Sequence, residues 1–229
     1  MISTHGITIV HILHMMVKYL DTIVKVIKKL GFNKWVYGET IAISYKDYSI
    51  GSIMPLGVLF NGQLLYARIY KGSSMYTSVM DLGYSNISIN ICNDPILFYY
   101  AIFNKDVLMD KVVYSNGFPH IRTCDAYIAT KVSRIDRYRD YIMVYMVPVN
   151  AVIKRKQPRV YNRAAFAIIE ALVYYTKLQY VSKDLASKYI EMIKFFTNIV
   201  YRSSSRRIHR KIIKDVLDRS IEKYKQNYG

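Results

Sequence analysis

Alternating apolar and polar residues separated by turn signals run from Val36 to Cys92, and this pattern constrains the fold more than any other part of the chain. It predicts strands over residues 36–45, 50–60, 63–70 and 86–92. Two further strands are expected at 125–136 and 141–153, and Pro148 marks the last as an edge or bulged strand. Only short helices interrupt these strands, so we expect a small antiparallel barrel rather than a doubly wound sheet.

The turns and short helices between these strands have their own signals. Asn61-Gly62 predicts a two-residue hairpin turn, and Gly83 closes a short helix that begins at Ser73. Asp94 and Pro95 can cap and begin a second short helix that runs to about Phe103.

Helical periodicity flanks the predicted barrel on both sides. The first helix begins near Ile9 and ends at Gly31. After a basic linker at residues 154–159, helices are predicted from Asn162, Ser182 and Ser205. The buried stripe of the second of these is expected at Leu185, Tyr189, Met192, Phe196 and Ile199. We therefore predict an N-terminal helical extension at 1–30, a barrel domain at 31–153 and a basic helical subdomain at 154–229.

Positive charge is concentrated in the last third of the chain. The whole sequence carries a net charge of +17, and residues 151–229 hold 18 Lys and Arg against 6 Asp and Glu. Such a surface suits nucleic acid, anionic lipid or a phosphorylated ligand, although a merely solvated helical surface is the commoner meaning. The outer face of the last helix carries Arg206, Arg207, Arg210, Lys211 and Lys214.

The cysteines and the hydropathy indicate a compartment. Cys92 and Cys124 are too few for a disulfide framework or a four-ligand zinc site, so we expect two buried small side chains and no metal. No apolar run is long enough to cross a bilayer, and no signal peptide is evident. We expect a soluble cytoplasmic protein that does not bind a membrane.

Two segments of the predicted barrel suggest a ligand. Lys71, Gly72, Ser73, Ser74 and Thr77 place a cation, a glycine and hydroxyl groups at a strand-to-helix turn, which is a plausible phosphate cradle. The alternative is an ordinary polar turn, because the segment lacks the Walker A spacing.

The second segment lies in the 50–60 strand. In Met54-Pro55-Leu56-Gly57, Pro55 has no N–H group to donate and Gly57 has no side chain, so a flat ligand could lie against this backbone. The alternative is a bulge at a barrel corner. No nucleophile and base stand together in the sequence, so an enzyme of this kind would depend on a cofactor, and its catalytic residues are unknown.

The order of these segments resembles an archaeal family known only as domain of unknown function 447. The resemblance covers residues 31–225. It rests on YGETI at 37–41, MPLGV at 54–58, KGSSMYT at 71–77, NICNDP at 90–95, DAYI at 125–128, YNRA at 161–164, IEAL at 169–172 and TKL at 176–178. The motifs depart from the family pattern at Met75-Tyr76 and at Cys92-Asn93.

The resemblance implies the FMN-binding split-barrel fold, an antiparallel six-stranded Greek-key barrel that forms a homodimer with FMN between the protomers. By that analogy, the phosphate would be held by Lys71, Gly72, Ser73, Ser74 and Thr77. The backbone of Met54, Pro55, Leu56 and Gly57 would face the isoalloxazine ring, and Asn90, Cys92 and Asp94 would line its edge or the ribityl chain.

Three functions are compatible with these features. The first is an FMN-binding flavoprotein, of the flavin-reductase kind, that acts on NAD(P)H or a small-molecule substrate. The second is a basic nucleic-acid-binding module, and the third is a structural dimer that has lost its cofactor.

Overall fold

The computed structural model describes residues 4–35, 37–154 and 163–229. Contacts divide the chain into two compact units, Met1–Cys92 with Lys105–Lys156, and Asn93–Asn104 with Gln157–Gly229. The first unit contains α1 (Thr4–Lys29), β1 (Gly38–Lys46), β2 (Ser49–Phe60), β3 (Leu65–Tyr70), α2 (Ser74–Met80), β4 (Asn86–Ile91), α4 (Lys105–Met109), β5 (Val112–Ser115), β6 (Phe118–Ile121), β7 (Ala126–Arg137) and β8 (Tyr141–Ile153). The second contains α3 (Pro95–Phe103), α5 (Arg163–Lys177), the 3-10 turn η1 (Leu178–Tyr180), α6 (Lys183–Ser203) and α7 (Arg207–Tyr228).

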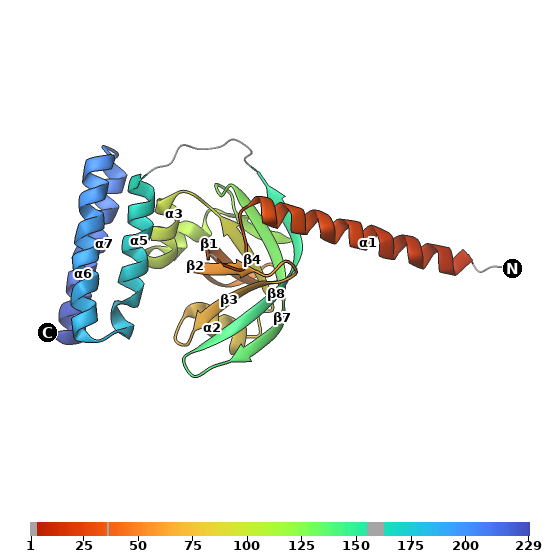
Figure 1. Cartoon of the computed structure of the whole chain (residues 1–229), viewed down its shortest axis with the longest axis horizontal. Coiled ribbons are helices and arrows are strands. Elements are labelled where there is room, and N and C mark those ends of the chain that lie inside the picture. The colour runs from red at the N-terminus through yellow and green to blue at the C-terminus, as the bar shows by residue number, and fades with distance from the viewer. Residues whose placement is uncertain (1–3, 36, 155–162) are drawn as a thin grey trace. The chain divides into compact units, whose positions relative to one another are not determined.

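Six strands of the first unit close into an antiparallel barrel in the order β1-β2-β3-β8-β7-β4. Figure 1 labels these strands. The predicted six-stranded barrel is thereby confirmed. Alternate side chains of β2, namely Leu56, Val58 and Phe60, point into the core, because successive residues of a strand face opposite sides.

Two predicted irregularities of the strands can be compared with the structure. Pro148 lies beside a bulge, since Ala129 pairs with Asn150 and Thr130 pairs with Pro148, as expected for a strand that lacks one N–H donor. The predicted two-residue turn at Asn61-Gly62 is wrong. Asn61 Oδ1 accepts hydrogen bonds from the N–H groups of Gln63 and Leu64, and this longer turn delays β3 until Leu65.

Helix α2 packs against the barrel strands. Met75 and Val79 belong to the barrel core, and the Ser44 and Ser78 hydroxyls lie 2.7 Å apart. A Cβ added at Gly51 would come within 2.2 Å of Ser78 Oγ, so the glycine permits α2 to approach β2.

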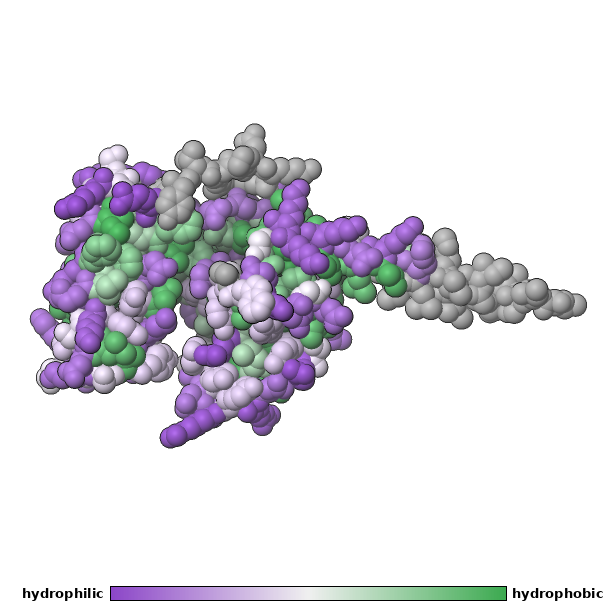
Figure 2. Space-filling model, viewed as in Figure 1, coloured by the Kyte–Doolittle hydropathy of each residue, from purple (hydrophilic) through white to green (hydrophobic). Residues whose placement is uncertain are grey.

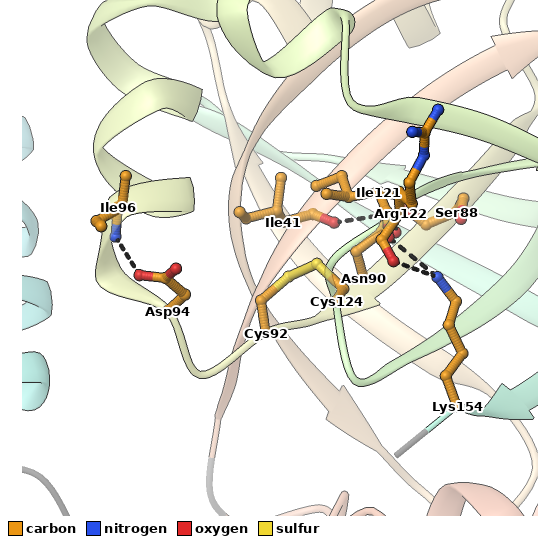
Figure 3. Close-up of a disulfide and its surroundings, with 10 residues drawn as sticks. All are labelled: Ile41, Ser88, Asn90, Cys92, Asp94, Ile96, Ile121, Arg122, Cys124 and Lys154. Carbon is orange, nitrogen blue, oxygen red and sulfur yellow. Dashed lines mark hydrogen bonds between the residues drawn. A yellow bond between two sulfur atoms is a disulfide. The ribbon is translucent and has the colours of Figure 1, made fainter.

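The segment between α3 and β7 was not assigned from the sequence, and it forms helix α4 and the β5–β6 hairpin. The hairpin contacts β1 and β4, and the Ile121 N–H donates to Asn90 Oδ1 at 2.8 Å. Cys124 follows this hairpin and is joined to Cys92 by a disulfide, which Figure 3 shows. The predicted burial of both cysteines is confirmed, but their pairing was not foreseen, because a sequence separation of 32 conceals their proximity.

The N-terminal helix is longer than predicted, and its side chains from Met15 onward fall into an exposed and a buried part. Near its C-terminal end, Ile23 and Ile27 are buried in the barrel core, and Gly31 follows with the expected positive φ of 93°. Met15, Val17, Tyr19 and Leu20 are exposed, so apolar surface remains on the described part of α1, as the green atoms in Figure 2 show.

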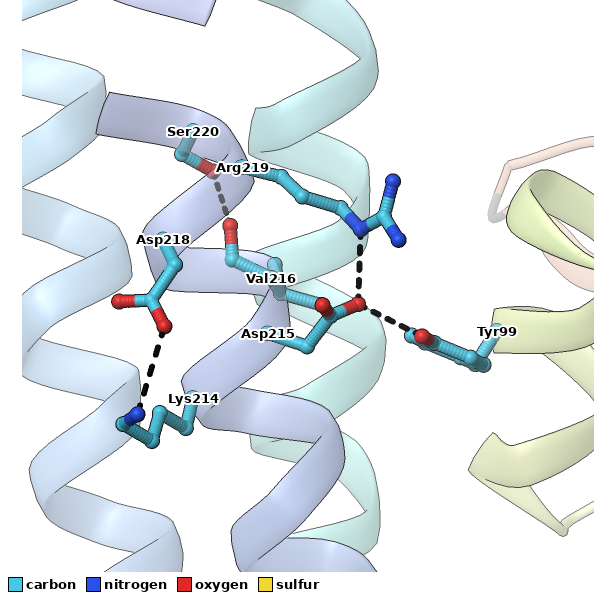
Figure 4. A network of polar contacts seen from close by, with 7 residues as sticks. All are labelled: Tyr99, Lys214, Asp215, Val216, Asp218, Arg219 and Ser220. Carbon is cyan, nitrogen blue, oxygen red and sulfur yellow. Dashed lines mark hydrogen bonds and ion pairs between the residues drawn. The ribbon is translucent and has the colours of Figure 1, made fainter. Parts of the chain in front are cut away.

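The second unit joins α3 to the three C-terminal helices. Asp94 caps α3 as predicted, with its Oδ1 accepting from the Ile96 N–H at 3.0 Å. Tyr99 donates to Asp215 Oδ2 at 2.6 Å, and Arg219 reaches the same oxygen at 2.8 Å (Figure 4). The predicted boundary between residues 153 and 154 assigns residues 93–104 to the barrel domain, whereas contacts group them with these helices.

One predicted helix face needs correction. The buried side chains of α6 are Ala186, Ile190, Ile193, Thr197 and Val200, not the stripe that begins at Leu185. Leu185 and Met192 are exposed. The prediction followed the large apolar residues, whereas the helix buries the small Ala186 and the Thr197 hydroxyl, which bonds to the Ile193 carbonyl.

Two predictions concern residues outside the described part of the chain. The basic linker lies almost entirely in residues 155–162, as does the cap predicted at Asn162, and both are outside the described residues. Among the described residues, no helix combines the length and apolar character that crossing a membrane requires.

Candidate functional site

A polar cluster lies where α2 begins, beside β2. Ser52 Oγ on β2 lies 2.7 Å from Ser74 Oγ, and Lys105 Nζ donates to Ser74 Oγ at 3.0 Å. We call these three residues the hydroxyl–lysine cluster. They come from β2, α2 and α4, so three segments that are remote in sequence converge on one point of the first unit.

The cation of this cluster is poorly neutralised. Lys105 is half-buried and has no acidic partner among the described residues. Burial lowers the pKa of Lys105 below its ordinary value, because desolvation disfavours the charged ammonium. An anion bound nearby would reverse that effect, so the cluster has the chemistry of a phosphate site.

In the predicted phosphate segment, some residues shape the turn and cap α2, and others remain exposed and could contact a ligand. The Ser73 hydroxyl donates to the Tyr70 carbonyl at 2.8 Å and accepts from the Tyr76 N–H at 3.2 Å, so it caps α2. Gly72 has a positive φ of 81°, as this turn requires. Lys71 and Thr77 are exposed, and each lies three residues from Ser74 of the hydroxyl–lysine cluster in the sequence.

The segment predicted to face a ring lies on the same strand as Ser52. Met54 lies two residues after Ser52, and Gly57 lies five residues after it. These separations correspond to about 7 and 17 Å along an extended strand. Leu56 is buried and belongs to the core, whereas Pro55 and Gly57 face the other side and are half-buried. The side chains of Tyr37 and Glu39 lie beside Gly57.

A small hollow adjoins this backbone. Its volume is about 150 Å³, and Leu30, Gly31, Phe32, Tyr37, Gly38, Glu39, Thr40 and Ile91 line it. Ligand pockets usually measure roughly 300 Å³ or more, so this hollow alone cannot enclose a drug-sized molecule.

Asn90, Cys92 and Asp94 have structural tasks in the described fold. The register aligns Asn90 with Ile41 and Pro55 across three strands. However, the Asn90 amide donates to the Ile41 and Ser88 carbonyls and accepts from Ile121, as Figure 3 shows in part. Cys92 is in the disulfide, and Asp94 belongs to the second unit, where it caps α3.

Sequence reasoning missed Lys105 and Ser52. Lys105 follows Asn104 at the end of α3, in a stretch without alternation, and Ser52 is one of two serines in its strand. No local pattern distinguishes either residue, since only the convergence of α4, α2 and β2 brings them together.

Residues 38–155 match the model of the family described as protein of unknown function (DUF447), N-terminal domain. An FMN-bound protein of that family from Methanosarcina mazei superposes with a TM-score of 0.70 at 23% identity, over 85% of this chain and 99% of that one. The barrel fold is therefore shared with that structure.

Two weaker likenesses are a flavoredoxin from Methanosarcina acetivorans and an FMN-binding protein from Thermus thermophilus. The flavoredoxin has a TM-score of 0.43 and 14% identity, over 56% of this chain and 74% of that one. The Thermus protein has a TM-score of 0.44 and 12% identity, over 56% and 81%. Scores of this size carry no argument about function.

Proposed function

The chain belongs to the family of unknown function 447, and on that basis we propose that it is a flavoprotein that binds FMN. The hydroxyl–lysine cluster carries the proposal. Among the described residues, the half-buried Lys105 ammonium donates to the Ser74 hydroxyl and has no acidic partner. Such an ammonium is costly unless an anion compensates it, and the FMN phosphate is such an anion.

The residues would divide the cofactor between them. Lys105, Ser74 and the exposed Lys71 and Thr77 would hold the phosphate, and the half-buried backbone at Pro55 and Gly57 would face the ring. Asn90 and Cys92 would support the site through the fold rather than through direct contact, because their side-chain groups are already engaged. Asp94 caps α3 in the second unit and would make no contact with the cofactor.

We further propose a homodimer with FMN between the protomers. The hollow beside Gly57 is too small to enclose an isoalloxazine ring, so a second surface must cover it. A second copy of the chain is the simplest source of that surface, because symmetric dimers are the commonest assemblies.

The reaction is proposed as a redox reaction. FMN supplies hydride and electron transfer when it is bound, and the protein would bind it, orient it and exclude water. The electron donor would be NAD(P)H or a small reduced molecule.

The first test is FMN binding by the purified protein. We expect a retained or restored flavin absorption spectrum and a higher melting temperature with excess FMN, because a ligand that binds only the folded state stabilises it. Bleaching of the visible band by NADH or NADPH without oxygen would support the reductase step.

Two variants test the phosphate site. We expect Lys105→Met and Lys71→Ala each to weaken FMN binding by about tenfold, the usual effect of losing one charged hydrogen bond. Lys25→Ala removes one exposed positive charge from α1 and is the matched control. A colourless protein that takes up no FMN would overturn the proposal, and equal affinity in all three variants would overturn the site.

A further inference from the structure

The second unit has a groove that FMN binding does not use. Tyr201, Arg207, Ile208, Arg210, Lys211 and Lys214 line it, at the end of α6 and the beginning of α7, and its volume is about 730 Å³. We call it the basic groove. Figure 2 shows hydrophilic residues beside hydrophobic ones on the visible face of these helices.

The four cations of the basic groove are mostly uncompensated. Arg207 and Lys211 form no ion pair among the described residues. The Arg210 guanidinium donates to the carbonyls of Ser204 and Tyr201, which carry no net charge, and only Lys214 has an acidic partner, Asp218 at 3.6 Å (Figure 4).

Their position on the helix is also unfavourable for stability. The first turn of α7 contains no acidic residue, and its start is capped by no side-chain hydrogen bond. Cations close to a helix N-terminus are repelled by the helix dipole. This arrangement therefore does not stabilise α7, and it suits an external anion.

Their spacing fits a linear polyanion. Arg207, Lys211 and Lys214 follow one another at intervals of four and three residues, so they share a face of α7. The eight residues from Arg207 to Lys214 span about 10 Å of helix. At about 3.4 Å per phosphate along one stacked strand, this length corresponds to about three spacings, or four successive phosphates.

The tertiary structure adds an aromatic ring to the cations. Tyr201 comes from α6, is 41% exposed, and lies with its ring centre 5.6 Å from the Arg210 guanidinium. A ring beside a row of cations is the combination that binds unpaired bases by stacking while the cations follow the backbone.

From these observations we propose that the basic groove binds single-stranded nucleic acid, with phosphates on Arg207, Arg210, Lys211 and Lys214 and one base on Tyr201. The part-exposed Tyr201 ring beside Arg210 favours a single strand over a bilayer surface, because lipid phosphates would need only the cations. The inference concerns the second unit alone, and it stands or falls separately from FMN binding.

The test is the salt dependence of binding to a short fluorescein-labelled single-stranded RNA of mixed sequence. With four phosphate contacts, the slope of log K against log salt should be about −3 between about 50 and 200 mM salt. Arg207→Ala with Lys211→Ala should make the slope shallower by about 1.4.

A matched control and a second variant separate the contributions. Lys183→Ala with Lys188→Ala removes the same charge about 20 Å or more along α6 from Tyr201, and it should leave the slope unchanged. Tyr201→Leu should lower the affinity about fivefold or more at an unchanged slope, because it removes stacking but no charge. Melting temperatures of all variants verify that they fold.

Three results would overturn the proposal. The first is absence of RNA binding at low salt. The second is a slope that falls equally in the control variant. The third is binding to duplex DNA or to phosphatidylserine vesicles that is as tight as binding to the single strand.

Discussion

At the scale of single residues, the Cys92–Cys124 disulfide is the least expected feature. It closes a loop of 32 residues that includes α3, α4 and the β5–β6 hairpin. By chain entropy, closing a loop of that length contributes about 3 to 4 kcal/mol to the free energy of unfolding. The bond therefore stabilises the place where the chain leaves the barrel after β4 and re-enters it before β7.

We predict that reduction of this disulfide lowers the free energy of unfolding by about 3 kcal/mol. Urea unfolding with and without dithiothreitol measures the difference. The double variant Cys92→Ser, Cys124→Ser should match the reduced protein and should not respond to dithiothreitol. An unfolding curve of the native protein that reductant leaves unchanged would contradict the prediction.

Residue types also explain which predicted site residues serve the fold. Asn90 is a candidate ligand residue because the family resemblance places it at the edge of the ring or along the ribityl chain. In the structure, the same amide satisfies two carbonyls and one N–H group in a buried position. A buried amide must be paired in this way, so its polarity alone could not distinguish a ligand contact from an internal one.

At the scale of elements, the fit of α2 against the barrel depends on one glycine. A side chain at Gly51 would meet Ser78 Oγ at 2.2 Å and the Tyr84 ring at 3.0 Å. Ser78 is buried and bonded to Ser44, so it has little room to move.

We predict that Gly51→Ala destabilises the protein by about 1 to 3 kcal/mol, the usual cost of overpacking a core. The Ser78→Ala background removes the closer of the two contacts, and there the same substitution should cost less. A double-mutant cycle measured by urea unfolding checks this coupling. Equal costs in both backgrounds would show that the contact with Ser78 does not limit the packing of α2.

At the scale of the whole molecule, a buried histidine in each unit, His120 in the first and His209 in the second, has a lowered pKa. Burial lowers the pKa of His120 in the first unit, and Lys154 lowers it further, against an opposing hydrogen bond to Phe118. Burial and Arg206 lower the pKa of His209 in the second unit, against the opposing effect of Asp94. Both histidines are therefore neutral in the folded protein at neutral pH.

The sign of the effect on stability follows from linkage. The unfolded chain takes up these protons first, so the stability is fully present above about pH 6.5 and is lost as the pH falls below it. We predict that each histidine contributes at most about 1.4 kcal/mol per pH unit to that loss. Urea unfolding between about pH 5 and 7.5 measures it, and His209→Gln or His120→Gln should flatten the slope. A stability that does not change across this range would contradict the prediction.

The sequence by itself determined the elements of this protein where local physics is strong. Alternation identified the six barrel strands, Gly31 and Asp94 marked helix ends, and Pro148 indicated a bulge. Each of these features depends on neighbouring residues alone, through side-chain period, backbone conformation or a missing donor.

Only the tertiary structure decided the features that depend on distant residues. The disulfide joins residues 32 apart, the hydroxyl–lysine cluster unites β2, α2 and α4, and the basic groove adds Tyr201 of α6 to the cations of α7. The grouping of α3 with the C-terminal helices is of the same kind. Local sequence patterns do not indicate which distant segments contact each other, and the candidate sites of this protein depend on such contacts.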